Sequence, residues 1–160
     1  MEIRWSVNGD VQLARNLRVF VTNLSKMREF YDEAVGIIEE KSDTIFEKKW
    51  SNVQKNPQWK PLSTKTLKAR ANRWGYYKQS PNNPSTLRWT GRLQTDRTKV
   101  INDKQGSLTF NAPYAIYHQE GSNKLPRRAM IDIDNQNAAD IVRALQTKIN
   151  KDIWISGLQA

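Results

Sequence analysis

The chain contains no cysteine, one histidine and no apolar run long enough to cross a membrane. Without cysteine it forms no disulfide and no thiolate metal site, which fits a reducing compartment. A transmembrane helix needs about 20 consecutive apolar residues. The N-terminus also lacks the apolar core of a signal peptide. We therefore expect no association with a membrane.

Catalytic and cofactor-binding motifs are also scarce. His118 has no second histidine and no cysteine with which to bind a metal. Glu120 is two residues away, and side chains two apart on a helix point in different directions. The acidic residues of segment 29–47 have the spacing of a solvated helix face, and no glycine-rich phosphate loop is present. We expect no enzyme activity, metal or cofactor, with a hydrolase that uses His118 as a minor alternative.

Basic residues are concentrated in one part of the chain. The 160 residues carry a net charge of +10. Residues 48–100 hold 13 basic and 1 acidic side chains, whereas residues 1–47 hold 6 basic and 9 acidic ones. A block this basic implies an anionic partner, either nucleic acid or an acidic protein surface.

Hydrophobic spacing predicts a single α+β domain over residues 1–160. A long amphipathic helix from Asn23 or Ser25 to Val53 and a C-terminal helix pack on a small, mostly antiparallel sheet. The basic segment 48–100, with a long loop at 75–86, lies between the long helix and the sheet. The other expected strands cover residues 2–8, 98–102, 107–111 and 129–133. The other expected helices are a short one capped by Asp10, a basic one from Ser63 or Thr64 to Trp74, and the last one from Asp134 or Asn135 to near Gly157. A helical turn closed by Gly121 is expected at 114–119.

Aromatic residues are interleaved with the basic ones in segment 48–100. This pattern fits nucleic-acid binding, in which cations neutralise phosphates and aromatics stack on bases. It fits a protein interface equally well, since Trp, Tyr and Arg are enriched there. A third interpretation places the tryptophans in the core and the lysines in solvent. The candidate contacts to DNA or to an acidic partner are Lys65, Lys68, Arg73, Lys78 and Arg88.

The acidic segment 29–47 lies next to the basic segment 48–100 in sequence. In a ring of identical subunits, the acidic face of one copy can meet the basic face of the next, because head-to-tail contacts close into rings when the rotation between subunits permits. The alternative is that these charges balance one another within one chain. The sequence leaves both arrangements open.

Three motifs have local physical explanations. In Trp59 to Arg70 (WKPLSTKTLKAR), Pro61 sets the start of a helix and Ser63 caps it. In Leu87 to Asp96 (LRWTGRLQTD), Gly91 permits a tight turn from which Arg92 reaches a carboxylate or a phosphate. In Tyr114 to Arg128, His118 and Gln119 offer hydrogen bonds to the backbone of a loop.

In this order, the three motifs resemble the phage virion morphogenesis family, the tail-completion and neck proteins of tailed bacteriophages. The spacing is also similar to that of head-tail connector and tail-terminator proteins. The resemblance extends to about Ile133, with departures at Glu120 and Met130, where the family usually has an aromatic residue. It implies a non-catalytic α+β subunit of a six-fold or twelve-fold ring, assembled in the host cytoplasm and located in the virion at the neck or tail end.

The resemblance also implies partners and contacts. The partners would be further copies of the chain, the portal-side adaptor, the tail tube or terminator, and genomic DNA in the channel. A nucleic-acid-binding module that uses residues 48–100 is the alternative function. The side chains expected to contact a neighbouring subunit or partner are Trp59, Arg70, Arg92, His118, Gln119, Arg127 and Arg128.

Overall fold

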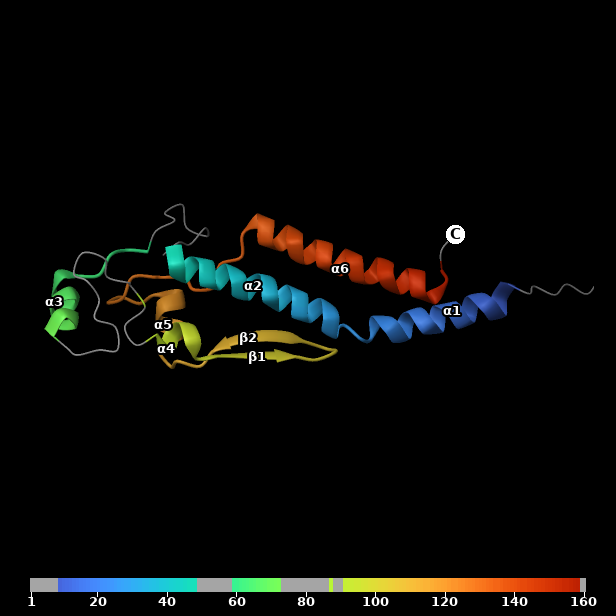
Figure 1. Cartoon of the computed structure of the whole chain (residues 1–160), viewed down its shortest axis with the longest axis horizontal. Helices are drawn as coiled ribbons and strands as arrows, with labels where there is room; N and C mark the ends of the chain where they lie inside the picture. The colour runs from blue at the N-terminus through green and yellow to red at the C-terminus, as the bar shows by residue number, and fades with distance from the viewer. Residues whose placement is uncertain (1–8, 49–58, 73–86, 88–90, 159–160) are drawn as a thin grey trace, which may run out of the picture.

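The computed structural model describes residues 9–48, 59–72, 87 and 91–158. The molecule is elongated, and its central helix lies between the C-terminal helix on one side and a two-stranded sheet on the other (Figure 1). The α+β prediction is confirmed. The predicted strand at 2–8 and the basic loop at 75–86 lie outside the described residues.

Two helices joined at a bend form the N-terminal part of the structure. Helix α1 covers Gly9–Leu24 and helix α2 covers Arg28–Lys48. The Ser25 hydroxyl donates to the Thr22 carbonyl at 2.7 Å, and the backbone N–H of Lys26 donates to Asn23 O at 2.9 Å, which closes α1. The long helix therefore begins at Arg28, later than predicted, because these bonds end the preceding helix first. Helix α1 begins at Gly9, so Asp10 lies inside the helix and is not its cap.

Strands β1 (Arg97–Ile101) and β2 (Gly106–Phe110) form an antiparallel hairpin, one residue away from the predicted bounds. Arg97 pairs with Phe110, and Ile101 pairs with Gly106. The Asn102 side chain closes the turn, because its Oδ1 accepts from the backbone N–H groups of Lys104 and Gln105 at 2.8 and 2.9 Å. This is the local hydrogen bonding for which Asn is favoured in turns.

The hairpin is stabilised by packing on α2, since an isolated two-stranded hairpin is marginal in water. Gly106 makes the close approach possible: an added Cβ would lie 2.8 Å from Val35 Cγ2 and 2.9 Å from Tyr31 Cβ. Strand β1 also forms salt bridges to the acidic face of α2. These join Arg97 to Asp43 at 3.0 Å and Lys99 to Asp32 at 2.9 Å. Part of that acidic face is therefore neutralised within the chain.

Helix α6 (Asn135–Ser156) lies along the other side of α2 and runs antiparallel to it (Figure 1). The prediction for its ends is confirmed. The Asp134 carboxylate caps the helix by accepting from the Asn137 N–H at 2.8 Å, and Gly157 ends it with a φ of 70°. Lys41 of α2 pairs with Asp134 at 2.6 Å, which attaches the start of α6 to α2. Helix α6 packs mainly on α2 and α1, and not on the sheet as predicted.

The inward face of α6 is partly polar. Lys148 and Asp152 are 9% and 2% exposed and form a salt bridge at 2.6 Å. Lys148 Nζ also lies 3.5 Å from the carbonyl of Asn23, at the bend between α1 and α2. Cations are stabilising near the C-terminal end of a helix, so the buried ammonium of Lys148 is favourable at this point. Val142 of this helix is 52% exposed.

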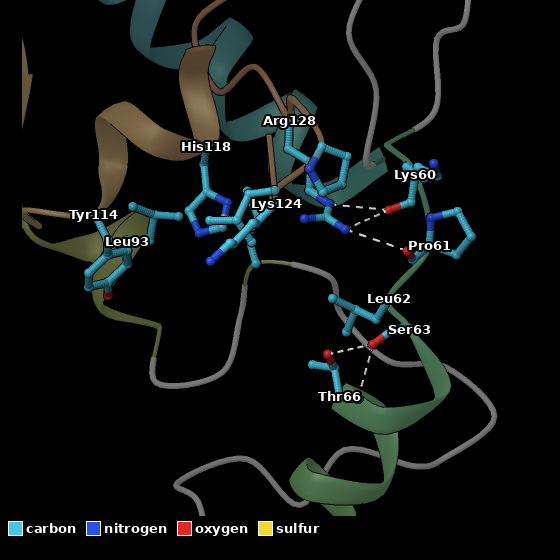
Figure 2. Close-up of a pocket in the computed structure, with 13 residues that line it drawn as sticks. Lys60, Pro61, Leu62, Ser63, Thr66, Leu93, Tyr114, His118, Lys124 and Arg128 are labelled. Atoms are coloured by element: carbon cyan, nitrogen blue, oxygen red, sulfur yellow. Dashed lines mark hydrogen bonds between the residues drawn. The ribbon is translucent and has the colours of Figure 1, made fainter. Parts of the chain in front are cut away.

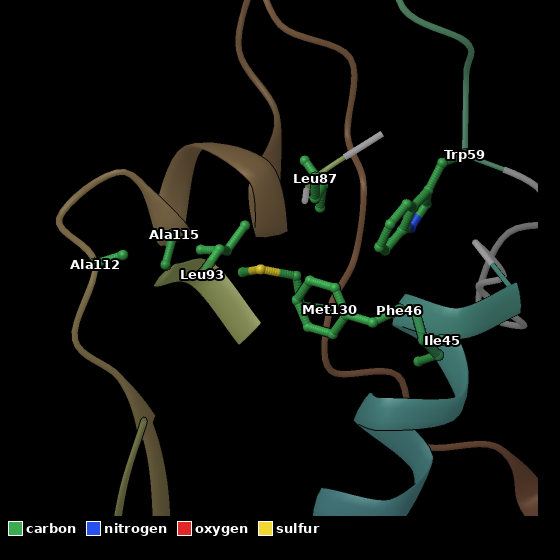
Figure 3. Packing of buried hydrophobic residues seen from close by; sticks show 8 residues of the cluster. All are labelled: Ile45, Phe46, Trp59, Leu87, Leu93, Ala112, Ala115 and Met130. Atoms are coloured by element: carbon green, nitrogen blue, oxygen red, sulfur yellow. The ribbon is translucent and has the colours of Figure 1, made fainter. Parts of the chain in front are cut away.

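The hydrophobic core lies at the C-terminal end of α2 (Figure 3). Phe46 contacts Trp59 edge to face, with ring centroids 5.7 Å apart. Three short helices gather at this end of the molecule (Figure 1): α3 (Thr64–Asn72), α4 (Arg92–Thr95) and α5 (Ala115–Glu120). The buried cluster consists of Ile45, Phe46, Trp59, Leu87, Leu93, Ala112, Ala115 and Met130.

Residues 129–133 do not form a strand, so that prediction is wrong. The backbone N–H groups of Met130 and Ile131 donate to the side chain of Gln119 and not to a neighbouring strand. Burial does not follow the apolar residues here either, because Ile133 is 46% exposed and Asp132 is 2% exposed. Among the described residues, no helix is both long and apolar enough to span a membrane.

Candidate partner-binding cavity

The three sequence motifs converge on one cavity of about 700 Å³ (Figure 2). The first motif contributes residues 60–63 and Thr66, the second Leu87 and Leu93, and the third Tyr114, His118 and residues 124–126 and 128. Segments that are far apart in sequence thus build a single concave surface. We call it the three-motif cavity.

The first motif forms one wall of the cavity, and its helix starts as predicted. Ser63 caps α3, because its Oγ accepts from the Thr66 backbone N–H at 3.2 Å and lies 2.8 Å from the Thr66 hydroxyl. Trp59 is only 7% exposed, and its Nε1 donates to the Ala129 carbonyl at 3.0 Å. Trp59 is therefore a core residue and not the surface contact that we predicted. Its hydrogen bond joins the first motif to the residue that directly follows the third.

Arg128 also joins the first and third motifs. It is 4% exposed, and its Nε and Nη2 donate to the carbonyl of Lys60 at 3.2 and 3.0 Å. This side chain was predicted to contact a neighbouring subunit, but the structure buries it inside its own chain. The neighbouring Arg127 is exposed, and its Nε donates to the Gln119 carbonyl at 3.0 Å. A paired arginine motif therefore contains one buried and one exposed member.

The second motif forms a charged turn beside the cavity. Gly91 adopts a φ of 75° at the start of α4, a conformation that favours glycine. Arg92 Nε donates to the Asp96 carboxylate at 2.9 Å, as expected for a contact to a carboxylate. Asn111 also donates to Asp96, at 3.0 Å. The hydrogen bond from Arg92, followed by that from Asn111, lowers the pKa of Asp96.

The third motif places His118 on the cavity wall. Helix α5 ends at Gly121 as predicted, with a φ of 81° and its N–H donating to Tyr117 O at 3.0 Å. The His118 ring lies edge-on to Tyr114, with centroids 6.2 Å apart, and its backbone carbonyl accepts from the Arg128 N–H at 2.7 Å. Gln119 bonds to the backbone of residues 130–131, as we expected of a loop-organising side chain.

The lining combines apolar side chains with positive charge. Leu93 and Leu87 are 2% and 8% exposed and belong to the core below the cavity. Lys60 and Lys124 are exposed at its edge. Among the described lining residues there is no aspartate or glutamate. Such a surface is suited to binding an apolar group that carries negative charge.

Several predicted contact residues lie away from this cavity or beyond the described part of the chain. Lys65 and Lys68 are exposed on α3, and Arg70 belongs to the same helix. Arg73, Lys78 and Arg88 fall outside the described residues. Sequence reasoning did not single out Lys124, whose loop position after Gly121 carries no periodic pattern. Its contribution depends on the fold of the loop beside Arg128.

The chain matches no family model, no curated protein and no solved structure.

Proposed function

We propose that this protein is a structural subunit of a homo-oligomeric ring at the head-tail junction of a bacteriophage, either a neck or tail-completion protein or a tail terminator. It would stabilise the joining of capsid and tail and would act without catalysis. Its partners would be further copies of itself, the portal-side adaptor and the tail tube or terminator. The order and spacing of the three motifs support this assignment.

The observation that carries the assembly role is the exposure of α1. Among residues 11–24 of this helix none is buried. Leu17 and Val21, which lie one turn apart, are 45% and 63% exposed. Most helical stability in proteins comes from packing an amphipathic face, and a short helix by itself is marginal in water. Helix α1 therefore lacks a partner for much of its apolar surface.

Helix α1 packs on α6 along one side only, and part of this contact is polar. Asn16 Nδ2 donates to the Gly157 carbonyl at 3.0 Å, while Phe20 and Leu24 are half-buried. A contiguous exposed apolar patch on a soluble domain commonly marks an interaction surface. A neighbouring copy that covers Leu17 and Val21 would complete this packing, and repetition of the contact would close a ring.

The test is the oligomeric state of the purified protein and of two variants. We expect the natural chain to form rings of six or twelve copies, measured by light scattering and electron microscopy. Leu17→Glu with Val21→Glu should yield monomers, because charge replaces the apolar contact. Val100→Glu is the control, since Val100 is 42% exposed and belongs to β1 and not to α1. A natural chain that stays monomeric at all concentrations and is absent from virions would contradict the proposal.

A second candidate function is binding to nucleic acid, which the exposed lysines of α3 favour. Within the described part of the chain, no carboxylate pairs with Lys65 or Lys68. If they contact phosphates, affinity for a labelled DNA duplex will fall steeply with salt, and Lys65→Glu with Lys68→Glu will flatten that dependence. Lys104→Glu, on the hairpin turn, is the control. No binding at low salt would eliminate this function.

A further inference from the structure

The three-motif cavity has the size and form of a binding site that is already built. Ligand pockets commonly have volumes of about 300–1,000 Å³, and this one has about 700 Å³. His118, Lys124 and Arg128 reach into it from α5 and the chain that follows, and Leu62 faces them from the other wall (Figure 2). The site lies at the opposite end of the molecule from α1 (Figure 1).

Internal hydrogen bonds hold the walls of the cavity in place. Arg128 joins the third motif to the carbonyl of Lys60, and Ser63 caps the helix that follows. Gly121 brings the end of α5 against Arg127, where an added Cβ would lie 3.0 Å from the backbone nitrogen. A preorganised site loses little conformational entropy when it binds a ligand. The cavity therefore requires no large rearrangement before it accepts an occupant.

The apolar part of the lining fits a bulky apolar side chain. Leu87 and Leu93 form the buried base, and Leu62 and Leu125 flank it. Pro61 and Pro126 contribute further apolar surface. Covering such a surface with an apolar side chain removes about 25 cal/mol of unfavourable hydration per Å². A bare phosphate or a nucleic-acid backbone would leave this base uncovered.

The charged part of the lining requires an acidic occupant. Lys60, Lys124 and Arg128 all line the cavity, and the described lining contains no carboxylate. Arg128 is already bonded to Lys60 O, so Lys60 and Lys124 are the side chains available to an incoming carboxylate. Complementary charge of this kind determines which partner binds.

The two longest segments outside the described residues do not have the required charge. Residues 49–58 and 73–86 contain lysine and arginine but no aspartate or glutamate. Either segment would bring positive charge to a positive cavity. Neither of these two segments therefore supplies an occupant with complementary charge.

We propose that the three-motif cavity binds a short acidic peptide segment of a partner protein. One bulky apolar side chain of that segment would sit on Leu87 and Leu93, and flanking carboxylates would pair with Lys60 and Lys124. This inference goes beyond the proposed ring function and uses a different surface. It would let the subunit recognise a partner by a peptide while α1 contacts neighbouring copies.

The test uses fluorescein-labelled twelve-residue peptides with a central Phe flanked on each side by Asp and Glu. Binding to the full chain is followed by fluorescence anisotropy. We expect saturable binding that weakens at least about tenfold when the acids become Asn and Gln, or when Phe becomes Ala. Lys60→Glu with Lys124→Glu should weaken binding by a similar factor. Peptides with Lys in place of the acids should regain binding to that double variant.

Lys104→Glu is the matched control, because this exposed lysine lies on the hairpin turn and changes the net charge by the same amount per site. It should leave the affinity within about twofold. The proposal would be overturned if the peptide did not bind, if Lys104→Glu lowered the affinity as much as the double variant does, or if replacing the central Phe left the affinity unchanged. Displacement of the peptide by an equimolar single-stranded oligonucleotide would also overturn it and assign the cavity to nucleic acid. Light scattering on the same samples measures the oligomeric state separately. A monomer that binds the peptide would contradict the proposed ring assembly but not the peptide site.

Discussion

Gln119 binds both backbone polar groups of Ile131 with one side-chain amide. Its Oε1 accepts from the Ile131 N–H at 3.1 Å, and its Nε2 donates to the Ile131 carbonyl at 2.8 Å. The same Oε1 accepts from the Met130 N–H at 2.8 Å. The amide thereby takes the place of a neighbouring strand, since buried backbone groups need partners. This contact places the third motif against the core.

Replacing Gln119 with Leu should lower the free energy of unfolding by about 2–4 kcal/mol, because each buried polar group left without a partner costs about 1–3 kcal/mol. Gln119→Glu should also destabilise, since a carboxylate oxygen would then face the Ile131 carbonyl. Urea unfolding measures both. Gln146→Leu, on the exposed face of α6, should change stability by less than about 0.5 kcal/mol. Equal effects at both positions would contradict the structural role of Gln119.

Replacing Arg128 with Lys should destabilise the chain by about 2–4 kcal/mol, because a single ammonium cannot reproduce the fork that binds the Lys60 carbonyl in a buried site. The matched change Arg127→Lys should cost less than about 1 kcal/mol, since Arg127 is exposed. Thermal unfolding compares the two variants. Amide exchange should also rise in residues 60–66 of Arg128→Lys alone. If Arg128→Lys left the thermal stability unchanged, the hydrogen bonds to the Lys60 carbonyl would contribute nothing to it.

Two glycines should respond in opposite directions to substitution by Ala. Gly121 combines a φ of 81° with a ψ of 176°, a region that essentially only glycine adopts. Gly121→Ala should therefore destabilise by about 1–3 kcal/mol. Gly36 lies inside α2 with nothing within 4 Å of an added Cβ. Gly36→Ala should stabilise by about 0.5–1 kcal/mol, because Ala is the better helix former. Differential scanning calorimetry distinguishes the two signs.

The contribution of Asp96 should depend on pH. The hydrogen bond from Arg92 lowers the pKa of Asp96 below its usual value, so the folded state favours the carboxylate. The resulting stability is present above the unfolded-state pKa and is lost as pH falls through the folded-state pKa. The difference in free energy of unfolding between the natural chain and Asp96→Asn should thus be constant above about pH 5. It should decrease toward zero at lower pH. Urea unfolding at several pH values measures it, and a difference that grew on acidification would contradict this pairing.

Several elements could be predicted from sequence because their causes are local. Ser63 and Asp134 cap helices through bonds to residues three positions away, and Gly157 ends α6 by its own backbone conformation. The hairpin follows from two short strands around Asn102. By contrast, the prediction of a strand at 129–133 was wrong because backbone groups of this segment form hydrogen bonds to the side chain of Gln119 and not to another strand. Alternation in sequence does not specify which group supplies the hydrogen bonds.

The sequence identified the motifs that form the candidate site but not how they are arranged in space. The motifs containing Trp59, Gly91 and His118 were identified from sequence, yet their convergence on one cavity requires long-range contacts. Trp59 and Arg128 were expected at a surface because Trp and Arg are frequent in interfaces. Their hydrogen bonds go to the carbonyls of Ala129 and Lys60, which are distant in sequence from Trp59 and Arg128 respectively.

By itself, the sequence determined the α+β composition, the caps and turns, and the excess of positive charge. These depend on hydrophobic period, on hydrogen bonds within a few residues and on counting side chains. The tertiary structure decided which side chains are buried, since burial depends on neighbours distant in sequence. It placed Arg128 inside the chain, left Leu17 exposed on α1 and brought Lys60 and Lys124 to one cavity. The surfaces that we propose for assembly and recognition depend on these contacts between residues that are distant in sequence.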